Sequence, residues 1–395
     1  MRKPTPDVLL CEAGFSSVPL FYAMRAVGHQ VMVIGNLADD PLHGIADRSE
    51  LIDYSDHDAV DEAIVGRDIR FLVPGCNDVS YWCAVLIAED RGFPGFDPKE
   101  VVSKFIFKDA FREHARKKGY RVPSAALSME SAQSLNPPIL VKPADVSGGK
   151  GMTLVEDLGA MERAWDYAEM TSPTGRALAE EFIEGQLYSH SAFLNNKEIV
   201  LDFFVTEYCT VYPFQVNSSH LSHDLDSVVS EGLRDWTHSF AEDLDLCDGL
   251  LHTQFIVDKN HEYWLIEVTR RCPGDLYAEL IRKSTGIDYA SLYCMPLCGR
   301  PLEVPEKAAK RVKYISRHTA SVSRAGIFLS SQANLENASV SVVPLKMMGQ
   351  KLAPSPFDKT GIFFIENADA ETMVKRTPSL HEEVIVEMAD DWKDA

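Results

Sequence analysis

Residues 139–157, ILVKPADVSGGKGMTLVED, combine an apolar strand, a glycine-rich loop and a second strand. This order predicts a hairpin with the glycine loop at its tip. It is not a Walker motif, because the GxxxxGKS/T spacing and the helix that should follow are missing. Lys142 and Lys150 bring positive charge to either side of the loop. Small residues leave backbone N–H groups open to phosphate oxygens: Ser147, Gly148, Gly149 and Gly151. The composition predicts a phosphate cradle, with a flexible hairpin tip as the alternative.

The segments before this hairpin predict an α/β domain. Residues 7–34 read as strand, loop, amphipathic helix and strand, and a further strand at 70–75 ends in the polar tip Cys-Asn-Asp at 76–78. Such tips line ligand crevices at the carboxyl ends of parallel strands, so we expect a doubly wound domain. Gly14 stands alone where a dinucleotide fold needs GxGxxG, which disfavours nicotinamide binding.

The segments after residue 105 predict an α+β module with a mostly antiparallel sheet. A charged helix at 108–121 closes at Gly119 and marks a domain boundary. Alternating segments, expected as strands around a helix at 226–244, are 176–194, 198–209, 252–258 and 262–268. We expect four domains: an α/β domain at 1–105, a small α+β subdomain at 106–185, a large one at 186–305 and a β-rich cap at 306–395.

Composition limits the possible classes of function. The 395 residues include 39 Lys plus Arg against 59 Asp plus Glu, a formal net charge of −20. This sign disfavours nucleic acid and anionic membranes as partners. No apolar run approaches the roughly 18 residues of a bilayer span, and the N-terminus lacks the apolar centre of a signal peptide. Eight cysteines without a CxxC pair argue against a disulfide scaffold or zinc ribbon. We therefore expect a cytoplasmic protein with reduced thiols.

An acidic string follows the apolar residues at 177–179, and it consists of Glu180, Glu181, Phe182, Ile183 and Glu184. A strand edge with a carboxylate and free backbone groups can pair with the amine and ring nitrogen of adenine, which are a donor and an acceptor side by side. A solvated strand end is the alternative.

A third cluster has the character of a metal site. Gln254 and Glu267 lie on two strands joined by a turn, so their oxygen atoms are expected opposite each other, with Thr269 on the same face. Oxygen ligands of this kind suit magnesium that carries nucleotide phosphates. Arg270 and Arg271 follow, and either is placed to hold an anionic phosphoryl group. An edge-strand ion pair is the alternative.

In their order and spacing, these strings resemble the ATP-grasp superfamily over residues 7–390. The resemblance implies an ATP-grasp fold, in which residues 106–185 are the small lid subdomain and 186–305 the large one. Lys108, eleven residues before Gly119, matches the lysine that opens a helix in that family. Lys142 matches its second lysine, and 147–151 matches its flexible loop over the β and γ phosphates.

The remaining ATP-grasp residues follow from the same resemblance. Glu180 and the backbone of Ile183 are implied at adenine, and Arg271 is implied at the transferred phosphoryl group. The metal ligands are implied as Gln254, Glu267 and Thr269. This chain departs from the family pattern in having Gln254 for a carboxylate, Thr269 for Asn and Leu187 for the glutamate that holds ribose.

Within the superfamily, LHTQF, IEVTRRCPGDL and ADVSGGKGM look most like L-amino-acid ligases, carnosine synthase and related carboxylate-amine ligases. The resemblance implies Arg271, Lys150 and His220 as catalytic residues. It implies as substrate-binding residues His220, His252, Arg271, Gly274 and Asp275. A solvated loop histidine is the alternative for His220. A general base is not assigned, and His220, His252 and Asp275 are the candidates.

The implied reaction joins a small carboxylic acid, such as an amino acid, to an amine through an acylphosphate, with ATP as phosphoryl donor and release of ADP and phosphate. The implied cofactor is Mg²⁺ or Mn²⁺, and a homodimer is the default assembly by resemblance. Two alternatives stay open: a ligase for a carrier-protein or natural-product acceptor, and a degenerate regulator that binds ATP. Substrate-dependent ATP turnover discriminates between ligase and regulator.

Overall fold

The first domain is a parallel sheet, as its strand–helix–strand sequence pattern predicts. The computed structural model describes residues 5–305, 312–336 and 338–390. The sheet has the order β3-β2-β1-β4, and its strands are β1 (Val8–Cys11), β2 (Val31–Gly35), β3 (Arg48–Leu51) and β4 (Phe71–Pro74). The helices are α1 (Val18–Ala26), α2 (His57–Ile64), α3 (Asp78–Arg91), η1 (Phe15–Ser17) and η2 (Pro41–Gly44). The Asn77 side chain caps α3 by accepting the Ser80 N–H at 2.9 Å. The polar tip at 76–78 therefore lies where β4 ends and α3 begins.

A small antiparallel sheet follows two connecting helices, α4 (Lys99–Ile106) and α5 (Lys108–Lys118). Gly119 ends α5 in the left-handed conformation, with φ 73°. The sheet has the order β5-β8-β6-β7, and its strands are β5 (Ala125–Ala126), β6 (Ile139–Pro143), β7 (Thr153–Val155) and β8 (Ala177–Glu181). Its helices are α6 (Met129–Ala132), η3 (Leu158–Ala160) and α7 (Met161–Thr171). β6 and β7 pair as the hairpin that the sequence predicts, with the glycine loop at its tip.

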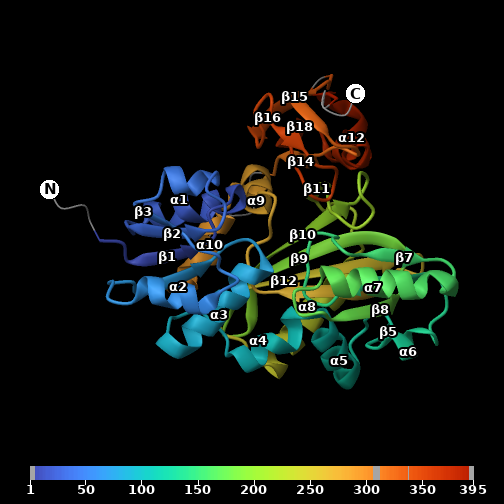
Figure 1. The fold of residues 1–395 in the computed structure, drawn as a ribbon, viewed down its shortest axis with the longest axis horizontal. Coiled ribbons are helices and arrows are strands. Elements are labelled where there is room, and N and C mark those ends of the chain that lie inside the picture. The colour runs from blue at the N-terminus through green and yellow to red at the C-terminus, as the bar shows by residue number, and fades with distance from the viewer. Residues whose placement is uncertain (1–4, 306–311, 337, 391–395) are drawn as a thin grey trace.

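The centre of the molecule is an eight-stranded sheet with the order β13-β12-β9-β10-β11-β14-β18-β16, in which all neighbours are antiparallel. Its strands are β9 (Gly185–Asn195), β10 (Glu198–Tyr208), β11 (Ser218–Leu221), β12 (Gly249–Asp258), β13 (Tyr263–Thr269), β14 (Tyr314–Ala320), β16 (Ser339–Pro344) and β18 (Gly361–Asn367). The helices between them are α8 (Ser227–Asp243), α9 (Tyr277–Thr285) and α10 (Tyr289–Leu297). Figure 1 shows the N-terminal sheet on one side of β9, β10 and β12, and the β5–β8 sheet with α7 on the other.

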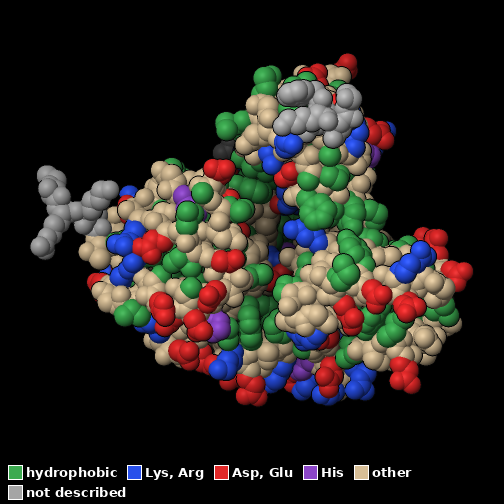
Figure 2. All heavy atoms as spheres, in the orientation of Figure 1, with side chains coloured by type: hydrophobic (Ala, Val, Ile, Leu, Met, Phe, Trp, Pro, Cys, Tyr) green, Lys and Arg blue, Asp and Glu red, His purple; other side chains and the backbone are tan. Residues whose placement is uncertain are grey.

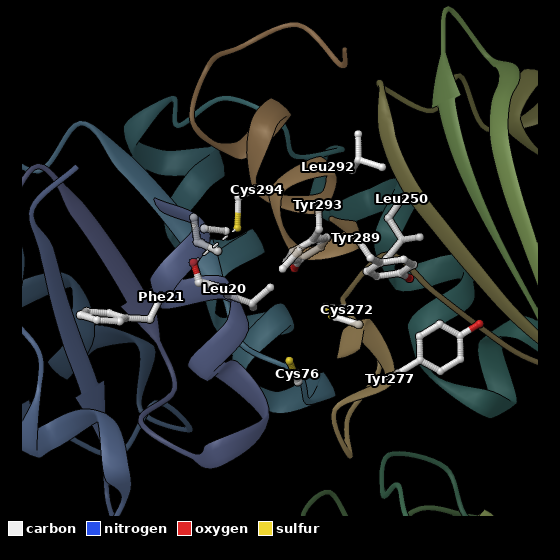
Figure 3. Packing of buried hydrophobic residues seen from close by; sticks show 14 of the residues in the cluster. Leu20, Phe21, Cys76, Leu250, Cys272, Tyr277, Tyr289, Leu292, Tyr293 and Cys294 are labelled. Atoms are coloured by element: carbon white, nitrogen blue, oxygen red, sulfur yellow. Dashed lines mark hydrogen bonds between the residues drawn. The ribbon is translucent and has the colours of Figure 1, made fainter. Parts of the chain in front are cut away.

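The two faces of the central sheet pack against different partners. Phe193 and Leu250 belong to a core shared with α9, α10 and the first domain, and we call their side the α9–α10 face. Figure 3 shows Leu250, Tyr289 and Cys272 gathered there between the strand and the helices. Phe255 belongs to the core shared with α4, α5 and α8, and we call that side the α8 face. Because side chains alternate along a strand, each polar residue of the sheet is assigned to one of these faces.

The last part of the chain joins two sheets. Its strands β14, β16 and β18 extend the central sheet, whereas β15 (Gly326–Ala333), β17 (Lys351–Leu352) and β19 (Val384–Ala389) form a three-stranded sheet of their own. The remaining helices are α11 (Ala370–Arg376), η4 (Thr377–Ser379) and α12 (Leu380–Glu383). The expected fold class, α/β followed by α+β with a β-rich end, is therefore confirmed. The expected division into four domains stays a prediction. Across the described ranges, no helix is both long and apolar enough to pass through a bilayer.

Candidate functional site

Lys142 and Glu180 form a buried ion pair between neighbouring strands of the small sheet. Lys142 Nζ lies 2.6 Å from Glu180 Oε2, and Arg112 Nε from α5 lies 2.8 Å from Oε1. Burial lowers the pKa of Lys142 to about 8, although Glu180 opposes this shift. Burial acts to raise the pKa of Glu180, but Arg112 and Lys142 outweigh it and lower that pKa. The carboxylate is thus paired with two cations, and the expected contact of Glu180 with adenine stays a prediction.

The hinge after β8 borders a cleft of about 750 Å³. Glu181 and Phe182 donate their N–H groups to Ser124 and Pro138 at 2.9 and 3.2 Å, whereas in the described part of the chain the Ile183 N–H has no backbone partner. The cleft is lined by residues 181–186 of the hinge and by the β12–β13 end, namely Val257, Asp258, Lys259, Asn260, Glu262 and Trp264. Its size suits a purine nucleoside, but its lining stops short of Lys142 and Glu267.

Gln254 and Glu267 are direct neighbours on β12 and β13, as the sequence predicts. Lys108 Nζ lies 3.5 Å from Glu267 Oε2 and donates to the Val146 carbonyl at 2.9 Å, which ties the start of α5 to this pair. His252 pairs with Thr269 two residues along the same strands. Because side chains alternate along a strand, the Thr269 hydroxyl lies on the α9–α10 face with Glu267. The arrangement offers a carboxylate, an amide oxygen and a hydroxyl to a hard cation.

Glu207 on β10 is a functional candidate that the sequence analysis missed. Gln254 Nε2 and Ser189 Oγ each donate to its carboxylate at 2.8 Å. Burial raises the pKa of Glu207, which is only 4% exposed. The amide nitrogen of Gln254 is fixed by this contact, which leaves its Oε1 as the atom available to a cation, so the donor set fits Mg²⁺. A carboxylate near the end of the strand expected at 198–209 is the one sequence signal that could have found Glu207.

Arg271 contacts the first domain. Its Nε lies 2.6 Å from Asp78 Oδ1 and its Nη2 3.1 Å from Oδ2. Burial acts to raise the pKa of Asp78, but Arg271, Lys108 and Ser147 outweigh it and lower that pKa. The first residue of α3, the catalytic arginine candidate and the glycine loop therefore meet at one point. Figure 2 shows the molecule hollowed between the first domain, the part that carries α7 and the C-terminal part.

The Arg270 side chain lies on the opposite side of β13, where its contacts stabilise the fold. It forms a buried ion pair with Asp97 at 2.5 Å and donates to the carbonyl oxygens of Leu250 and Cys247 at 2.9 and 2.8 Å. Of the two adjacent arginines, only Arg271 lies on the face that carries Gln254 and Glu267.

The expected histidines lie on different faces. His252 is buried on the α9–α10 face with Nδ1 2.8 Å from Ser191 Oγ, and burial, helped by Arg271, lowers its pKa to about 3. His220 pairs with Thr206, which pairs with Tyr188, and Tyr188 pairs with Phe255 of the α8 face. The structure therefore does not bring His220 to Arg271 or Glu267, and we correct its expected catalytic and substrate-binding role.

The glycine loop is docked on the rest of the molecule. Gly148, Gly149 and Gly151 all have positive φ, between 72 and 77°. Tyr212 donates its hydroxyl to the Gly149 carbonyl, and the Gln215 amide donates to the Gly148 carbonyl, both at 3.4 Å. The exposed Lys150 Nζ lies 5.9 Å from the centre of the Phe357 ring, and the Ser147 side chain lies near Asp78.

Comparisons with known proteins agree with this geometry. Residues 103–274 match the family model described as "ATP-grasp domain". Over these residues the chain is similar to that domain family. The whole chain shares its fold with the L-amino acid ligase of Bacillus licheniformis, which superposes with a TM-score of 0.80 at 18% identity, covering 98% of this chain and all of that one. Phosphoribosylglycinamide synthetase from Anaerococcus prevotii superposes with a TM-score of 0.74 at 15% identity, again over 98% of this chain and all of that one.

A sequence relative matches part of the chain. Formate-dependent phosphoribosylglycinamide formyltransferase of Sulfurovum sp. (strain NBC37-1) is 25% identical over 191 residues, which is 46% of this chain and 49% of the relative. The matched part of the chain spans about half the length of the relatives of this name.

Residues after the segment that matches the family model contact one another next to Gly274. Asp275, in the left-handed conformation with φ 53°, pairs with Lys359 and accepts the Thr319 hydroxyl at 3.2 Å. Its backbone N–H donates to Ser16 at 3.1 Å, and Gly274 next to it faces Cys76 and Ser16. Arg317 of β14 donates to the Asp275 carbonyl at 2.9 Å. Sequence analysis did not single out Arg317 or Lys359, since neither lies in a motif.

Proposed function

We propose that the protein is an ATP-dependent carboxylate-amine ligase that acts through an acylphosphate. The observation that carries this proposal is the grouping of Gln254, Glu267 and Arg271 on one face of two paired strands, with Lys108 against Glu267. A site of this kind can hold the phosphates of ATP, a divalent cation and an anionic reacting group at the same place.

Each group has a task that follows from its charge and position. Lys142, Lys108 and the backbone N–H groups of 147–151 offset the charge of the nucleotide phosphates. Gln254, Glu267 and Thr269 would hold Mg²⁺, which when bound supplies positive charge to the β and γ phosphates. Glu207 fixes the amide of Gln254 in the orientation that this task requires. The hinge at Ile183 would receive adenine.

The reaction consists of two substitution steps, and these residues bind and orient the substrates in both. A carboxylate oxygen of the acid attacks the γ-phosphorus of ATP, and the bond to the β–γ bridging oxygen breaks, which releases ADP. The amine then attacks the acyl carbon, the carbon–oxygen bond to phosphate breaks, and the proton that the nitrogen loses leaves with the phosphate. Arg271 leaves Asp78 or shares it in order to hold the transferred phosphoryl group. The docked glycine loop excludes water, which would hydrolyse the acylphosphate.

The test is release of ADP and phosphate from MgATP over a panel of amino acids, formate and other small acids, with hydroxylamine as a general acceptor. We expect one acid to raise release and to yield a hydroxamate, and one amine to replace hydroxylamine. ATP binding without release for any acid would overturn the ligase and favour a regulator. A hydroxamate without any free amine acceptor would favour a carrier-bound or other macromolecular acceptor.

A further inference from the structure

The segment 353–360 joins β17 to β18, and we call it the C-terminal strap. Its path is fixed by backbone hydrogen bonds. Ser355 donates its N–H to the Val322 carbonyl at 2.7 Å, and Thr360 donates to the Ala320 carbonyl at 2.8 Å. Ala320 is the last residue of β14, and Val322 follows it closely. The strap is therefore held in a fixed position on a strand of the central sheet.

Gln215, in the loop between β10 and β11, joins the strap to the glycine loop. Its Nε2 donates to the Pro356 carbonyl at 3.2 Å and to the Gly148 carbonyl at 3.4 Å. Its Oε1 accepts from the Ser355 hydroxyl at 3.1 Å. A primary amide offers two N–H donors and a carbonyl acceptor, so this one side chain can bind the strap and the loop at the same time. The C-terminal part therefore holds the glycine loop through Gln215.

A second contact joins the same two segments. The Phe357 side chain of the strap is 61% exposed, and Lys150 Nζ of the glycine loop lies 5.9 Å from the centre of its ring. This distance is within the range of cation–π interactions. A ring with this exposure gains little from burial, so core packing does not explain its position. The loop is thus held at two of its residues, Gly148 and Lys150.

The other end of the strap contacts the loop that follows Arg271. Lys359 of the strap forms an ion pair with Asp275, which lies between β13 and α9. The Asp275 N–H donates in turn to the Ser16 hydroxyl of the first domain at 3.1 Å. One short segment therefore contacts both the glycine loop and the backbone that leads away from Arg271.

The contacts between strap and glycine loop are few and individually weak, as a lid that opens requires. A neutral hydrogen bond shifts an equilibrium by roughly 2- to 10-fold, and an exposed cation–π contact shifts it by roughly 2- to 5-fold. Gly148 and Lys150 are exposed, so water can replace these contacts when the loop moves away. The loop can therefore stay closed over a bound nucleotide and still open once in each reaction cycle.

We infer that the C-terminal strap is the catch that holds the glycine loop closed, and that Gln215 is the positioning residue that joins the two. The strap thereby sets how fast a bound nucleotide leaves and how well water is excluded from the site. The inference rests on the proposed function in one respect, which is that the glycine loop covers nucleotide phosphates. It adds a role in the reaction for residues of the C-terminal part that lie in none of the sequence motifs.

The experiment measures the rate at which ADP leaves the wild-type protein and the variants Gln215→Glu and Phe357→Leu. Glutamate has the shape of glutamine and still accepts from Ser355, but it lacks the N–H donors and places an oxygen against two carbonyl oxygens. Fluorescent N-methylanthraniloyl ADP, bound with Mg²⁺, is displaced by excess unlabelled ADP in a stopped-flow instrument. We expect the dissociation rate to rise about 5- to 50-fold in Gln215→Glu and about 2- to 5-fold in Phe357→Leu. Amide hydrogen exchange over 147–151 should rise in the same order.

Gln350→Glu is the matched control in the same C-terminal part. The Gln350 side chain uses its oxygen to accept the Met347 N–H at 2.7 Å, which glutamate retains, so this variant should release ADP at the wild-type rate. A purely structural role of Gln215 predicts a different result. Gln215→Glu would then lower the unfolding midpoint and leave ADP release and exchange over 147–151 as in the control, and that outcome would overturn the inference.

Turnover separates this inference from the proposed function. In Gln215→Glu we expect acid-independent ATP hydrolysis to rise and the hydroxamate formed per ADP released to fall, because water enters the site. A wild-type chain that forms no hydroxamate with any acid would overturn the proposed function, and the rate of ADP release would still decide the role of the strap. A wild-type chain that binds no ADP would overturn both.

Discussion

Arg270 and Arg271 are adjacent in the sequence, but they have opposite environments. Arg271 lies with Asp78 beside the proposed metal ligands, so Arg271→Ala should lower turnover by about 10²- to 10³-fold and leave the ATP dissociation constant nearly unchanged. The measurement is steady-state ADP release together with nucleotide titration. Wild-type turnover in this variant would contradict the assignment of Arg271.

Arg270 provides the matched comparison. Arg270→Met leaves Asp97 buried without its partner, which should destabilise the fold by about 3–5 kcal/mol. Chemical denaturation measures this loss, and the folded fraction should still turn over substrate. A variant that stays as stable as the wild type but loses activity would show that the two arginines have been assigned the wrong way round.

Lys142 makes nucleotide binding depend on pH. Its pKa is lowered to about 8 by burial, and nucleotide phosphates bind the charged form. Below about pH 8 the lysine already carries its proton, so this group adds no pH dependence to binding. Above that pH the free protein has lost the proton and binding must take one up, so the dissociation constant for ADP should rise by up to about tenfold per pH unit.

Calorimetry tests this linkage without a variant. ADP is titrated at pH 7 and pH 8.5 in buffers of different ionisation enthalpy. We expect net proton uptake by the protein to be larger at pH 8.5 than at pH 7. Equal uptake at both values would mean that Lys142 keeps its proton throughout.

At the scale of single elements, the β6–β7 hairpin depends on one glycine more than on its neighbour. Gly148 and Gly149 both have positive φ, so alanine strains the backbone at either position. At Gly149 an added Cβ would also lie 2.6 Å from the Phe214 carbonyl, whereas at Gly148 the nearest atom is 3.7 Å away. Gly149→Ala should therefore lose the docked loop.

The pair of variants separates loop docking from backbone strain. We expect Gly149→Ala to lower kcat at least about tenfold more than Gly148→Ala, and to raise acid-independent ATP hydrolysis because water enters. Amide hydrogen exchange over 147–151 should rise in Gly149→Ala alone. Equal effects of the two variants would show that strain, and not docking, limits the reaction.

Among these elements, sequence patterns predict pairings between strands that are close in the chain, but not pairings between distant strands. The hairpin and the Gln254–Glu267 pair follow from strand alternation between two segments joined by one turn, which is local information. His220 is expected at the site only from the family resemblance. The expectation fails because the face of His220 depends on the register of β11 against β10, across a loop of nine residues between them. Arg317 could not be found, since its neighbours Ser219 and Glu207 are about 100 residues away in the chain.

At the scale of the whole molecule, the C-terminal part is continuous with the central sheet. Sequence composition predicts a β-rich end, but it carries no signal for which sheet each strand joins. β14 pairs with β11, and β18 and β16 follow it, whereas β15, β17 and β19 pair only among themselves. These two sets alternate along the chain, so no single cut removes one sheet and keeps the other.

This continuity makes the C-terminal part necessary for the stability of the rest. Ile315, Ile362 and Phe364 belong to the core that also contains Phe193 and Leu250. Burying each of the first three is worth about 1.5–3 kcal/mol, so their loss amounts to roughly 5–9 kcal/mol. A domain is typically stable by only about 5–15 kcal/mol. A chain shortened to residues 1–305 should therefore lose cooperative unfolding and aggregate through the uncovered edge of β11.

Coexpression of the two pieces tests how much the β11–β14 junction contributes to stability. Residues 1–305 and 306–395, produced together, should copurify and regain the unfolding transition and the acid-dependent ATP turnover of the intact chain. Circular dichroism on heating and size-exclusion chromatography follow both. If 1–305 alone unfolds at the temperature of the intact chain, the C-terminal part is a separate cap and the β11–β14 junction contributes little.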